Sequence, residues 1–429
     1  MIPLIEKKRD KKELNEKEIE FIVKGAAGGS IPDYQLSAFL MAVTLNGMTP
    51  RETLAMTLNM AESGDMLDLS SLKNTADKHS TGGVGDKTTL ITAPAAASLG
   101  CTVAKMSGRG LGYTGGTVDK LESVPGFKTD VSPESFKAQA EKIGICLAGQ
   151  SGNFAPADKR LYALRDVTAT VNSIPLIASS IMSKKLAAGA ESIVLDVKFG
   201  SGAFMKTAED AEELAREMVE IGRGAGRRMS AVITDMSSPL GYAVGNSLEV
   251  AEAVEVLKGG GPEDLAGLSA VLAAEMYSLS FGLSAEEALA AAKNAVSGGA
   301  GFDKLCELVS AQGGDVRYLT GEKTFPSSES VTEVISEAEG YIISTDCELI
   351  GKASVISGAG RAELGEKIDP AAGIRLFRKY GDYVRRGEMI GRIYGRKERL
   401  AEAAEVFYSA FELGAERPPE RKLIYKIIR

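Results

Sequence analysis

The sequence predicts an α/β protein in three parts: a small all-helical domain, a large α/β domain and a C-terminal β-rich subdomain. Three observations support this prediction. Residues 1–68 show apolar residues at helical spacing and no strand pattern. From about residue 74, short apolar runs alternate with glycine loops and helices, which is typical of α/β units. From about residue 330, short strands alternate with turns.

The N-terminal helices are indicated by apolar stripes and by start signals. Ile19, Ile22 and Val23 form one stripe, which is expected to close at Gly25. The run Thr49-Pro50-Arg51-Glu52 is a capping box with proline at the first helical position, so it predicts the start of another helix.

The α/β region contains buried apolar runs that lead directly into loops. The clearest is the strand expected at 192–198, which is followed by a glycine loop at 199–203. Ligands of open α/β sheets bind beyond the carboxyl ends of strands. We therefore expect four loops to converge on one edge, namely 77–89, 107–117, 199–203 and 235–245.

The stretch from Asp77 to Glu122 holds two glycine-dense loops on either side of an apolar segment about one helix long. Glycine lets backbone N–H groups approach a ligand, and hydroxyls, ammonium groups and oriented N–H groups surround bound anions. Such groups occur in both loops: Lys78, Ser80, Thr81, Lys87, Thr88 and Thr89 in the first, and Lys105, Ser107, Arg109, Thr114 and Thr117 in the second. The sequence therefore predicts an oxyanion site for phosphate.

The second loop also fits the GxGxxG dinucleotide fingerprint at 110–115, with Asp130 near the ribose-binding spacing. That fingerprint opens a long helix after an apolar strand. Here the charged residues Lys105 and Arg109 precede it, and Pro125-Gly126 stops any helix soon afterwards. A nicotinamide-dependent dehydrogenase is therefore disfavoured.

The composition argues against several other classes of protein. The net charge of −8 disfavours a nucleic-acid or anionic-membrane partner. Four separated cysteines without a CxxC suit a reducing cytoplasm and offer no metal-ligand spacing. The charged N-terminus does not resemble a signal peptide, and no apolar run approaches the ~20 residues that span a bilayer.

Several long blocks, in order, resemble the pyrimidine and thymidine phosphorylases. They are DKHSTGGVGD (77–86), SGRGLGYTGGTVDKLE (107–122), LYALRDVTATVNSIPLIASSIMSKK (161–185), VLDVKFGSGAFMK (194–206) and DMSSPLGYAVGNSLEV (235–250). The resemblance covers nearly the full length. It implies a mixed central sheet and a chain that crosses between domains. The implied domains are helical at 1–68 and 156–190, α/β at 69–155 and 191–329, and C-terminal at 330–429.

The resemblance implies reversible phosphorolysis of uridine, thymidine or deoxyuridine, which gives the free base and (deoxy)ribose 1-phosphate, in a cytoplasmic homodimer serving nucleoside salvage. Positions matching the phosphate ligands are Lys78, Ser80, Thr89, Ser107 and Thr117, with Lys105 beside them. Positions matching the base ligands are Arg165, Ser180 and Lys184. The only histidine, His79, lies between two of the phosphate positions and is expected beside the leaving base. Catalytic roles are implied for His79, Arg165 and Lys184.

Departures from the family pattern bear on specificity. Tyr113 stands where many members have histidine, whereas Thr89 and the run 105–107 resemble the broad-specificity enzymes. We therefore favour the broad type over a thymidine-restricted enzyme. A third possibility is a transferase like anthranilate phosphoribosyltransferase, which needs Mg²⁺ and paired acids. Asp86 and Asp119 are the nearby candidates, and they do not form a sequence pair.

Relatives that bind potassium hold it behind the first loop. The matching positions are Gly85, residue 87, Leu240, Ala243 and Glu252. Residue 87 is lysine here, and a protonated lysine has no lone pair to give to a cation. We expect Lys87 to replace the ion and to pair with Glu252, so no cofactor and no metal ligand is predicted.

The C-terminal part contains the run Gly381–Ile390, which is similar to the hammerhead turn of lipoyl-type domains. No convincing carrier-lysine hairpin accompanies it. A structural role is therefore favoured for this subdomain.

Overall fold

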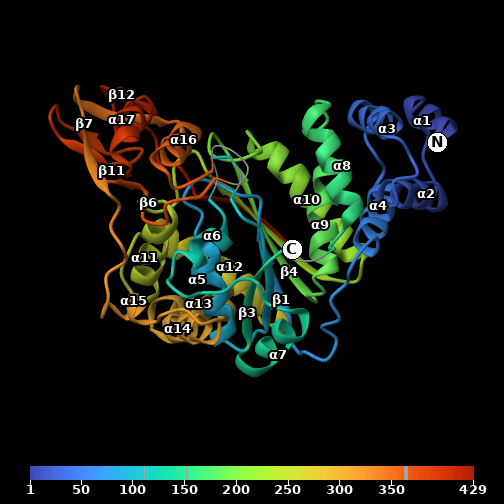
Figure 1. The fold of residues 1–429 in the computed structure, drawn as a ribbon, viewed down its shortest axis with the longest axis horizontal. Coiled ribbons are helices and arrows are strands. Elements are labelled where there is room, and N and C mark those ends of the chain that lie inside the picture. The colour runs from blue at the N-terminus through green and yellow to red at the C-terminus, as the bar shows by residue number, and fades with distance from the viewer. Residues whose placement is uncertain (111, 114, 151–152, 362–365) are drawn as a thin grey trace.

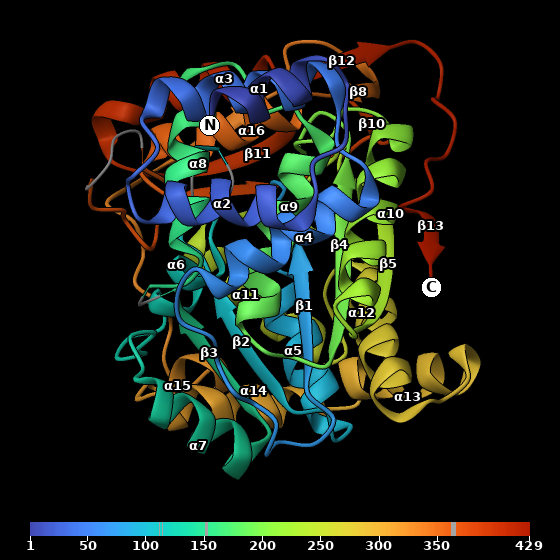
Figure 2. The ribbon, with the colours of Figure 1, turned by 90° about the vertical axis from the view of Figure 1, so that its right-hand side faces the viewer.

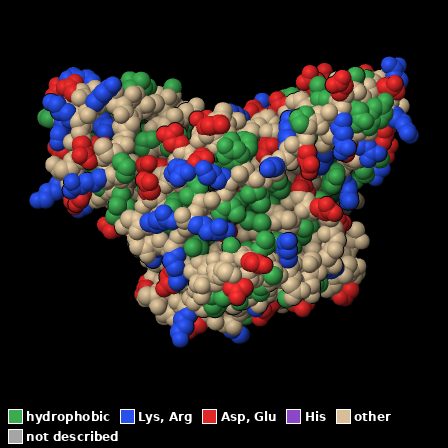
Figure 3. All heavy atoms as spheres, turned by 180° about the vertical axis from the view of Figure 1, so that it is seen from behind, with side chains coloured by type: hydrophobic (Ala, Val, Ile, Leu, Met, Phe, Trp, Pro, Cys, Tyr) green, Lys and Arg blue, Asp and Glu red, His purple; other side chains and the backbone are tan. Residues whose placement is uncertain are grey.

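The computed structural model describes residues 1–110, 112–113, 115–150, 153–361 and 366–429. A helical unit and a C-terminal subdomain form two lobes on either side of a central α/β domain (Figure 1). Seen from behind, the two lobes rise above a hollow (Figure 3). Among the described residues, none of the helices combines the length and the apolar character that a membrane span requires.

The helical unit is built from helices at both ends of the first half of the chain. They are α1 (Ile2–Arg9), α2 (Glu16–Ala27), α3 (Asp33–Asn46), α4 (Pro50–Glu62), α8 (Pro156–Val167) and part of α9 (Ile174–Ala187). The predicted capping box is present, because the Thr49 side chain accepts from the Glu52 N–H and Glu52 accepts from the Thr49 N–H. Gly25 does not end α2. A Cβ there would lie 2.3 Å from Ile31, so this glycine lets the following chain pack closely.

Helix α9 belongs to two cores. Leu176 packs with the N-terminal helices, whereas Ile177 and Met182 pack with β4 (Ser192–Phe199) and α10 (Ala208–Gly224). The segment 156–190 therefore returns to the helical unit, as the resemblance implied, and it also contacts the α/β domain.

The central sheet has the order β1-β4-β5-β13 and is mixed, as expected. Its parallel strands are β1 (Ala76–Ser80), β4 and β5 (Arg228–Asp235), and β13 (Ile424–Ile428) pairs antiparallel with β5. The boundary expected at 330–429 is therefore wrong for this last strand, which leaves the C-terminal subdomain. A parallel pair, β2 (Val103–Ser107) with β3 (Ile145–Gly149), joins the sheet by a bridge between Thr75 and Thr102.

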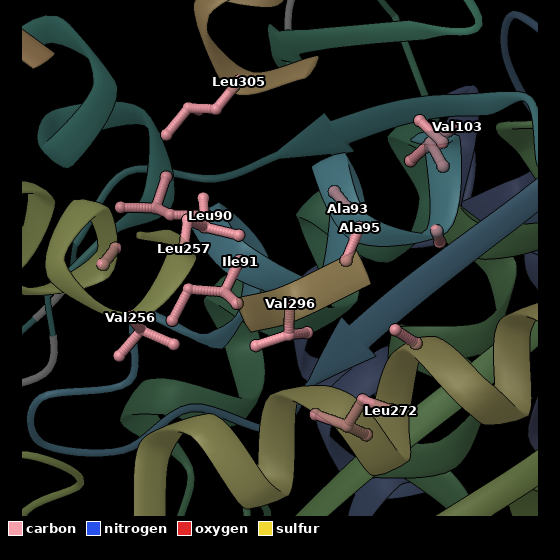
Figure 4. Close-up of a cluster of buried hydrophobic side chains, with 14 of the residues drawn as sticks. Leu90, Ile91, Ala93, Ala95, Val103, Val256, Leu257, Leu272, Val296 and Leu305 are labelled. Carbon is pink, nitrogen blue, oxygen red and sulfur yellow. The ribbon is translucent and has the colours of Figure 1, made fainter. Parts of the chain in front are cut away.

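Helices cover both faces of this sheet (Figure 2). Helix α10 packs on one face and α12 (Glu263–Phe281) on the other. The rest of the domain adds α5 (Thr88–Ser98), α6 (Thr117–Glu122), α7 (Pro133–Ile143), α11 (Asn246–Leu257), α13 (Ala285–Ser297), α14 (Ala300–Ala311) and the short α15 (Arg317–Thr320). The largest core lies where α5 meets α12, α13 and α14. Figure 4 shows Leu90 and Ile91 of α5 facing Leu257, Val296 and Leu305. This apolar support fixes the N-terminal end of α5, next to the first glycine loop.

The C-terminal subdomain holds two small sheets, ordered β6-β9-β11-β7 and β10-β8-β12. Its elements are β6 (Ala243–Val244), β7 (Ser330–Ile335), β8 (Gly340–Thr345), α16 (Cys347–Ser357), β9 (Gly373–Leu376), β10 (Tyr383–Val384), β11 (Met389–Gly395), α17 (Leu400–Tyr408) and β12 (Phe411–Gly414), with one 3-10 turn at Lys397–Arg399. The predicted hammerhead-like run spans β10 and the start of β11. Strand β6 comes from the α/β domain, so the two parts share a sheet.

Candidate active site

A cavity of about 250 Å³ lies where the two glycine loops meet helix α9. Its lining comes from β1, the first loop, α5, β2, the second loop and α9. Of the predicted site residues, it brings together His79, Ser80, Thr89, Lys105, Ser107, Thr117 and Lys184. A larger cavity of about 490 Å³ lies apart from these loops, between the C-terminal tail and the loop after β5.

Strand β1 distributes its side chains to two sides, because neighbouring residues of a strand point in opposite directions. Asp77 interacts with Lys105 and Lys185, whereas Lys78 interacts with Thr88 and Asp196. Residues 77–80 were expected in a loop, but they form the strand itself. This strand geometry fixes the directions of the side chains before any ligand binds.

Lys78 differs from its expected place. Its Nζ atom donates to Thr88 Oγ1 at 2.6 Å and lies 3.1 Å from Asp196 Oδ2. The side chain is buried and does not line the cavity. Lys78 therefore supports the start of α5 from below, and its ammonium does not face the cavity.

Asp86 organises the first glycine loop. Ser80 Oγ donates to Asp86 Oδ2 at 2.5 Å, and Thr88 Oγ1 donates to Asp86 Oδ1 at 2.6 Å. Burial opposes ionisation, but the ammonium groups of Lys198 and Lys78 outweigh it and hold the pKa of Asp86 well below its usual range. The carboxylate is therefore charged at neutral pH, and it accepts the one hydroxyl hydrogen of Ser80.

Two helices begin at the cavity wall. Thr89 lies in the first turn of α5, and Thr117 is the first residue of α6. The first N–H groups of a helix have no partner within the helix, and the helix dipole favours negative charge there. The hydroxyls of these two threonines therefore stand beside backbone groups that suit an anion.

The second glycine loop is tied down by Asp119. Its Oδ2 atom accepts from the Gly110 N–H at 2.7 Å, and its carboxylate pairs with Arg109 and with Arg361 of the C-terminal subdomain. Thr114, which was among the expected hydroxyls, lies outside the described residues. Arg109 pairs with acids in this structure, so its charge is partly neutralised.

Lys105 is buried and lines the cavity. Its Nζ atom lies 3.1 Å from Asp77 Oδ1 and also donates to the Lys78 carbonyl. Burial lowers the pKa of Lys105 to about 8, against the opposing effect of Asp77. Lys105 therefore carries its charge at neutral pH and begins to lose it not far above.

His79 faces the same cavity and is half-buried. Burial, together with the positive charges of Lys185 and Lys105, holds the pKa of His79 well below its usual range. The imidazole is therefore neutral at pH 7. A neutral imidazole can donate one hydrogen bond, but it has no second proton to give.

Lys184 is the one predicted base ligand that reaches the cavity. Its Nζ atom lies 2.6 Å from Asp158 Oδ2 on α8 and 3.3 Å from Ser180 Oγ. Ser180 itself is buried and does not line the cavity. The Lys184 ammonium is thus held in place by two neighbours on the helical segment.

Arg165 also differs from its expected place at the base. It is buried, and its guanidinium donates to three backbone carbonyls, those of Thr170, Val171 and Leu176. These bonds hold the turn between α8 and α9. Arg165 therefore fixes the helix that carries Lys184, and it does not line the cavity.

One further expectation is corrected by the structure. The loops at 199–203 and 235–245 do not line this cavity; Met236 packs behind Gly83 and supports the first loop.

Lys185 also lines the cavity, although it is only 4% exposed, and its Nζ atom lies 2.8 Å from Asp77 Oδ2.

Asp77 and Asp158 were not identified from the sequence. Each carboxylate lies far along the chain from the lysine it holds, Lys185 and Lys184 respectively. Asp77 had one available signal, since a buried strand that contains an acid needs a cationic partner.

Lys87 lies behind the first loop. Its Nζ atom donates to the carbonyls of Leu240 and Ala243 at 2.8 and 2.7 Å, and to Glu252 Oε2 at 2.5 Å. The expected pairing of Lys87 with Glu252 is therefore present, and the lysine is almost fully buried. These oxygens surround an ammonium, so the residues present do not fit a potassium ion at the same place.

Comparison with known proteins matches three family descriptions in order along the chain. Residues 2–64 match the helical bundle domain of a glycosyl transferase family, and residues 72–302 match its a/b domain. Residues 341–414 match the pyrimidine nucleoside phosphorylase C-terminal domain.

Two relatives that match over the full length carry the same name. The chain is 49% identical over 427 residues to a pyrimidine-nucleoside phosphorylase of Geobacillus stearothermophilus, with 99% of each chain covered. It is 47% identical over 430 residues to one of Bacillus subtilis (strain 168), covering 100% of this chain and 99% of that one. A crystal structure of anthranilate phosphoribosyltransferase from Thermus thermophilus shares the fold, with a TM-score of 0.60 and 22% identity over 72% of this chain and 98% of that one.

Proposed function

The chain belongs to the pyrimidine-nucleoside phosphorylases and is a pentosyltransferase, and on this premise we propose that it catalyses reversible phosphorolysis of uridine, thymidine and deoxyuridine. One observation carries the proposal. A single cavity has hydroxyls and helix ends on one side and Lys184 on the other. This arrangement suits an anionic nucleophile and a leaving group that becomes negative.

In the proposed reaction, a phosphate oxygen forms a bond to C1′ of the nucleoside while the bond from C1′ to the base nitrogen breaks. The bonding electrons pass to the pyrimidine, and the products are the sugar 1-phosphate and the base anion, which then takes a proton. We assign phosphate to Thr89, Lys105, Ser107 and Thr117, which line the cavity, and to Ser80, whose hydroxyl must turn from Asp86 to donate to the anion. No protein nucleophile is needed for this displacement.

Lys184 is assigned to the pyrimidine oxygens, where it stabilises charge that grows as the bond breaks. Arg165 and Ser180 act behind it, by holding α9 and the lysine. Neutral His79 is assigned a hydrogen bond to the substrate, because its low pKa leaves it without the proton of an imidazolium. Lys78 supports the phosphate loop from beneath.

The broad substrate range is supported by Thr89 and the run 105–107, and by relatives named for pyrimidine nucleosides in general. A phosphoribosyltransferase that uses magnesium is not favoured. Its nearby acids are engaged: Asp86 with serine and threonine hydroxyls, and Asp119 with two arginines.

The direct test is release of free base from uridine, thymidine and deoxyuridine, with and without inorganic phosphate. We expect release from all three, only with phosphate. Release that ignores phosphate would indicate a hydrolase. Release from thymidine alone would indicate the restricted enzyme, and no release from any of them would overturn the proposal.

Lys87 is proposed to replace the potassium ion of relatives. Support comes from its three oxygen contacts, which occupy the positions implied for the ion. The ammonium links the start of α5 to the segment before α11 without any exchange of ions. The proposal requires no cofactor for the reaction.

Closure of the cleft over both substrates is also proposed. The phosphate-side groups come from β1, β2, α5 and α6, whereas Lys184 comes from α9, whose chain returns to the helical unit. The crossings near 65–75, 150–156 and 188–192 are the proposed hinges; residues 151 and 152 lie outside the described residues. Movement of this kind would exclude water during the reaction.

A homodimer is proposed through the N-terminal helices. Helix α3 buries Leu36, Leu40 and Val43, yet Tyr34 and Leu45 on its other side are each 74% exposed. With Met41 they form a stripe at helical spacing, and a helix that is apolar all round is normally buried. A second copy of this chain would cover the stripe.

Four free cysteines support a reducing compartment, which we propose is the cytoplasm. There the enzyme is proposed to serve nucleoside salvage.

A further inference from the structure

One buried carboxylate connects the two halves of the cavity. Asp77 Oδ1 lies 3.1 Å from Nζ of Lys105, on strand β2, and Asp77 Oδ2 lies 2.8 Å from Nζ of Lys185, on helix α9. All three side chains are at most 5% exposed. Both lysines line the cavity, and Asp77 stands behind them.

The physical cost of this arrangement indicates that it is specific. Removing an ionised group from water costs several kcal/mol, and only close pairing offsets that cost. Here one carboxylate accepts from two ammonium groups, one at each oxygen, so each lysine has a defined direction. Lys185 lies in the last turn of α9. Its neighbour Lys184 pairs with a different acid, Asp158.

We propose that Asp77 is a positioning residue that fixes where the phosphate side and the base side of the cavity lie relative to each other. It holds Lys105 toward the phosphate side, and through Lys185 it fixes the rotation of α9 that presents Lys184 to the base side. This inference rests on the proposed phosphorolysis and adds a residue that does not itself touch the substrate.

The charges around Lys105 make the inference testable. Asp77 and His79 of strand β1 lie on its side of the strand, the Lys78 ammonium acts on it from the other side, and α9 presents Lys185. Strand β3, which pairs with β2, consists of Ile145, Cys146, Leu147, Ala148 and Gly149 and carries no charge. Asp77 favours the protonated form of Lys105, whereas Lys185 disfavours it. The two partners of one ion pair therefore act in opposite directions on the same group.

The test compares Asp77→Asn and Lys185→Met with the wild-type chain. The measurement is kcat/KM for phosphate from pH 6 to pH 10 at saturating uridine. We expect each variant to lose at least tenfold in kcat. The alkaline decline should move to lower pH in Asp77→Asn and to higher pH in Lys185→Met. A change of the same sign in both, or no change in either, would overturn the inference.

Matched variants separate positioning from general damage. Lys8→Met breaks another buried pair, that of Lys8 with Glu52 at 2.7 Å, in the helical unit. It should lower the melting temperature and leave the pH profile in place. Lys185→Arg retains the charge and should keep the wild-type decline, so the test stands even if Asp77→Asn does not fold. If the wild type is active and the pH profiles of Asp77→Asn and Lys185→Met match its own, this inference alone is refuted. If the wild type shows no phosphate-dependent release of base, the proposed function is refuted.

Discussion

The Nζ atom of Lys184 lies 2.6 Å from the Oδ2 atom of Asp158, so the cation assigned to the pyrimidine is already held by a buried acid on the preceding helix. The pair places the ammonium at the cavity wall without any ligand. Its position therefore depends on α8 as well as on α9, and Arg165 fixes the turn between these two helices.

Lys184→Ala should lower kcat/KM for uridine, because a charge-assisted contact to the leaving base is lost. The corresponding loss of transition-state stabilisation should be about 2–4 kcal/mol. Steady-state kinetics measures this. Lys159→Ala, which removes an exposed lysine from the same helical segment, is the control and should be nearly silent. Near-normal turnover by Lys184→Ala would remove this residue from the site.

Phosphate-dependent activity should fall as the pH rises through about 8, because the pKa of Lys105 is lowered to about 8 and its neutral amine no longer attracts phosphate. The pH profile of kcat/KM for phosphate measures this decline. Arginine retains its charge throughout this pH range, so in Lys105→Arg the decline of kcat/KM for phosphate should be absent or should occur at higher pH. Titration of the substrates is common to both proteins. An identical decline in the arginine variant would assign it to another group.

Lys87→Thr should lose activity and recover part of it when potassium is added, because threonine restores an oxygen ligand and removes the competing ammonium. The wild type should be equally active in potassium and in tetramethylammonium salts. Rate measurements at constant ionic strength check both statements. A wild type that needs potassium would contradict the replacement of the ion by Lys87.

Leu45→Glu should convert a dimer into a monomer, because it places a charge in the exposed stripe on α3 that a second copy is proposed to bury. Light scattering coupled to size exclusion measures the mass. Lys17→Glu, an exposed charge change on α2, is the control and should leave the mass unchanged. A wild-type chain that is monomeric at micromolar concentration would refute the proposed interface.

The protein should become more compact when phosphate and a non-reactive nucleoside analogue bind together. The physical reason is that the two sets of side chains contact different ends of the combined substrates, so closure is favoured only when both are present. Small-angle X-ray scattering measures the radius of gyration. An unchanged radius with both ligands bound would contradict closure.

Much of the fold could be predicted from local signals. The capping box at Thr49 and the buried apolar strand at 192–198 each depend on neighbouring residues, and both are confirmed. Gly25 misled, because its small size serves packing against Ile31 and does not end the helix. Strand β13 was missed as part of the central sheet, because its pairing with β5 joins segments that are far apart in the chain.

The site was predictable where residue type alone decides the chemistry. Hydroxyls and glycines in two loops predicted the anion side, and Ser80, Thr89, Ser107 and Thr117 do line one cavity. Direction was not predictable. Whether a lysine faces the cavity, as Lys184 does, or lies beneath it, as Lys78 does, depends on partners such as Asp158 and Asp196 that only the folded chain brings near.

Strand β13 also bears on the order in which the chain can fold. Ile424 pairs with Thr234, so the edge of β5 stays uncovered until a segment from the far end of the sequence has arrived. Such distant contacts form slowly, because the intervening loop must close first. During that interval β5 presents a row of unpaired backbone groups, which is a template for association with another chain. Refolding at high concentration should therefore lose material to aggregation at this edge, before the last strand docks.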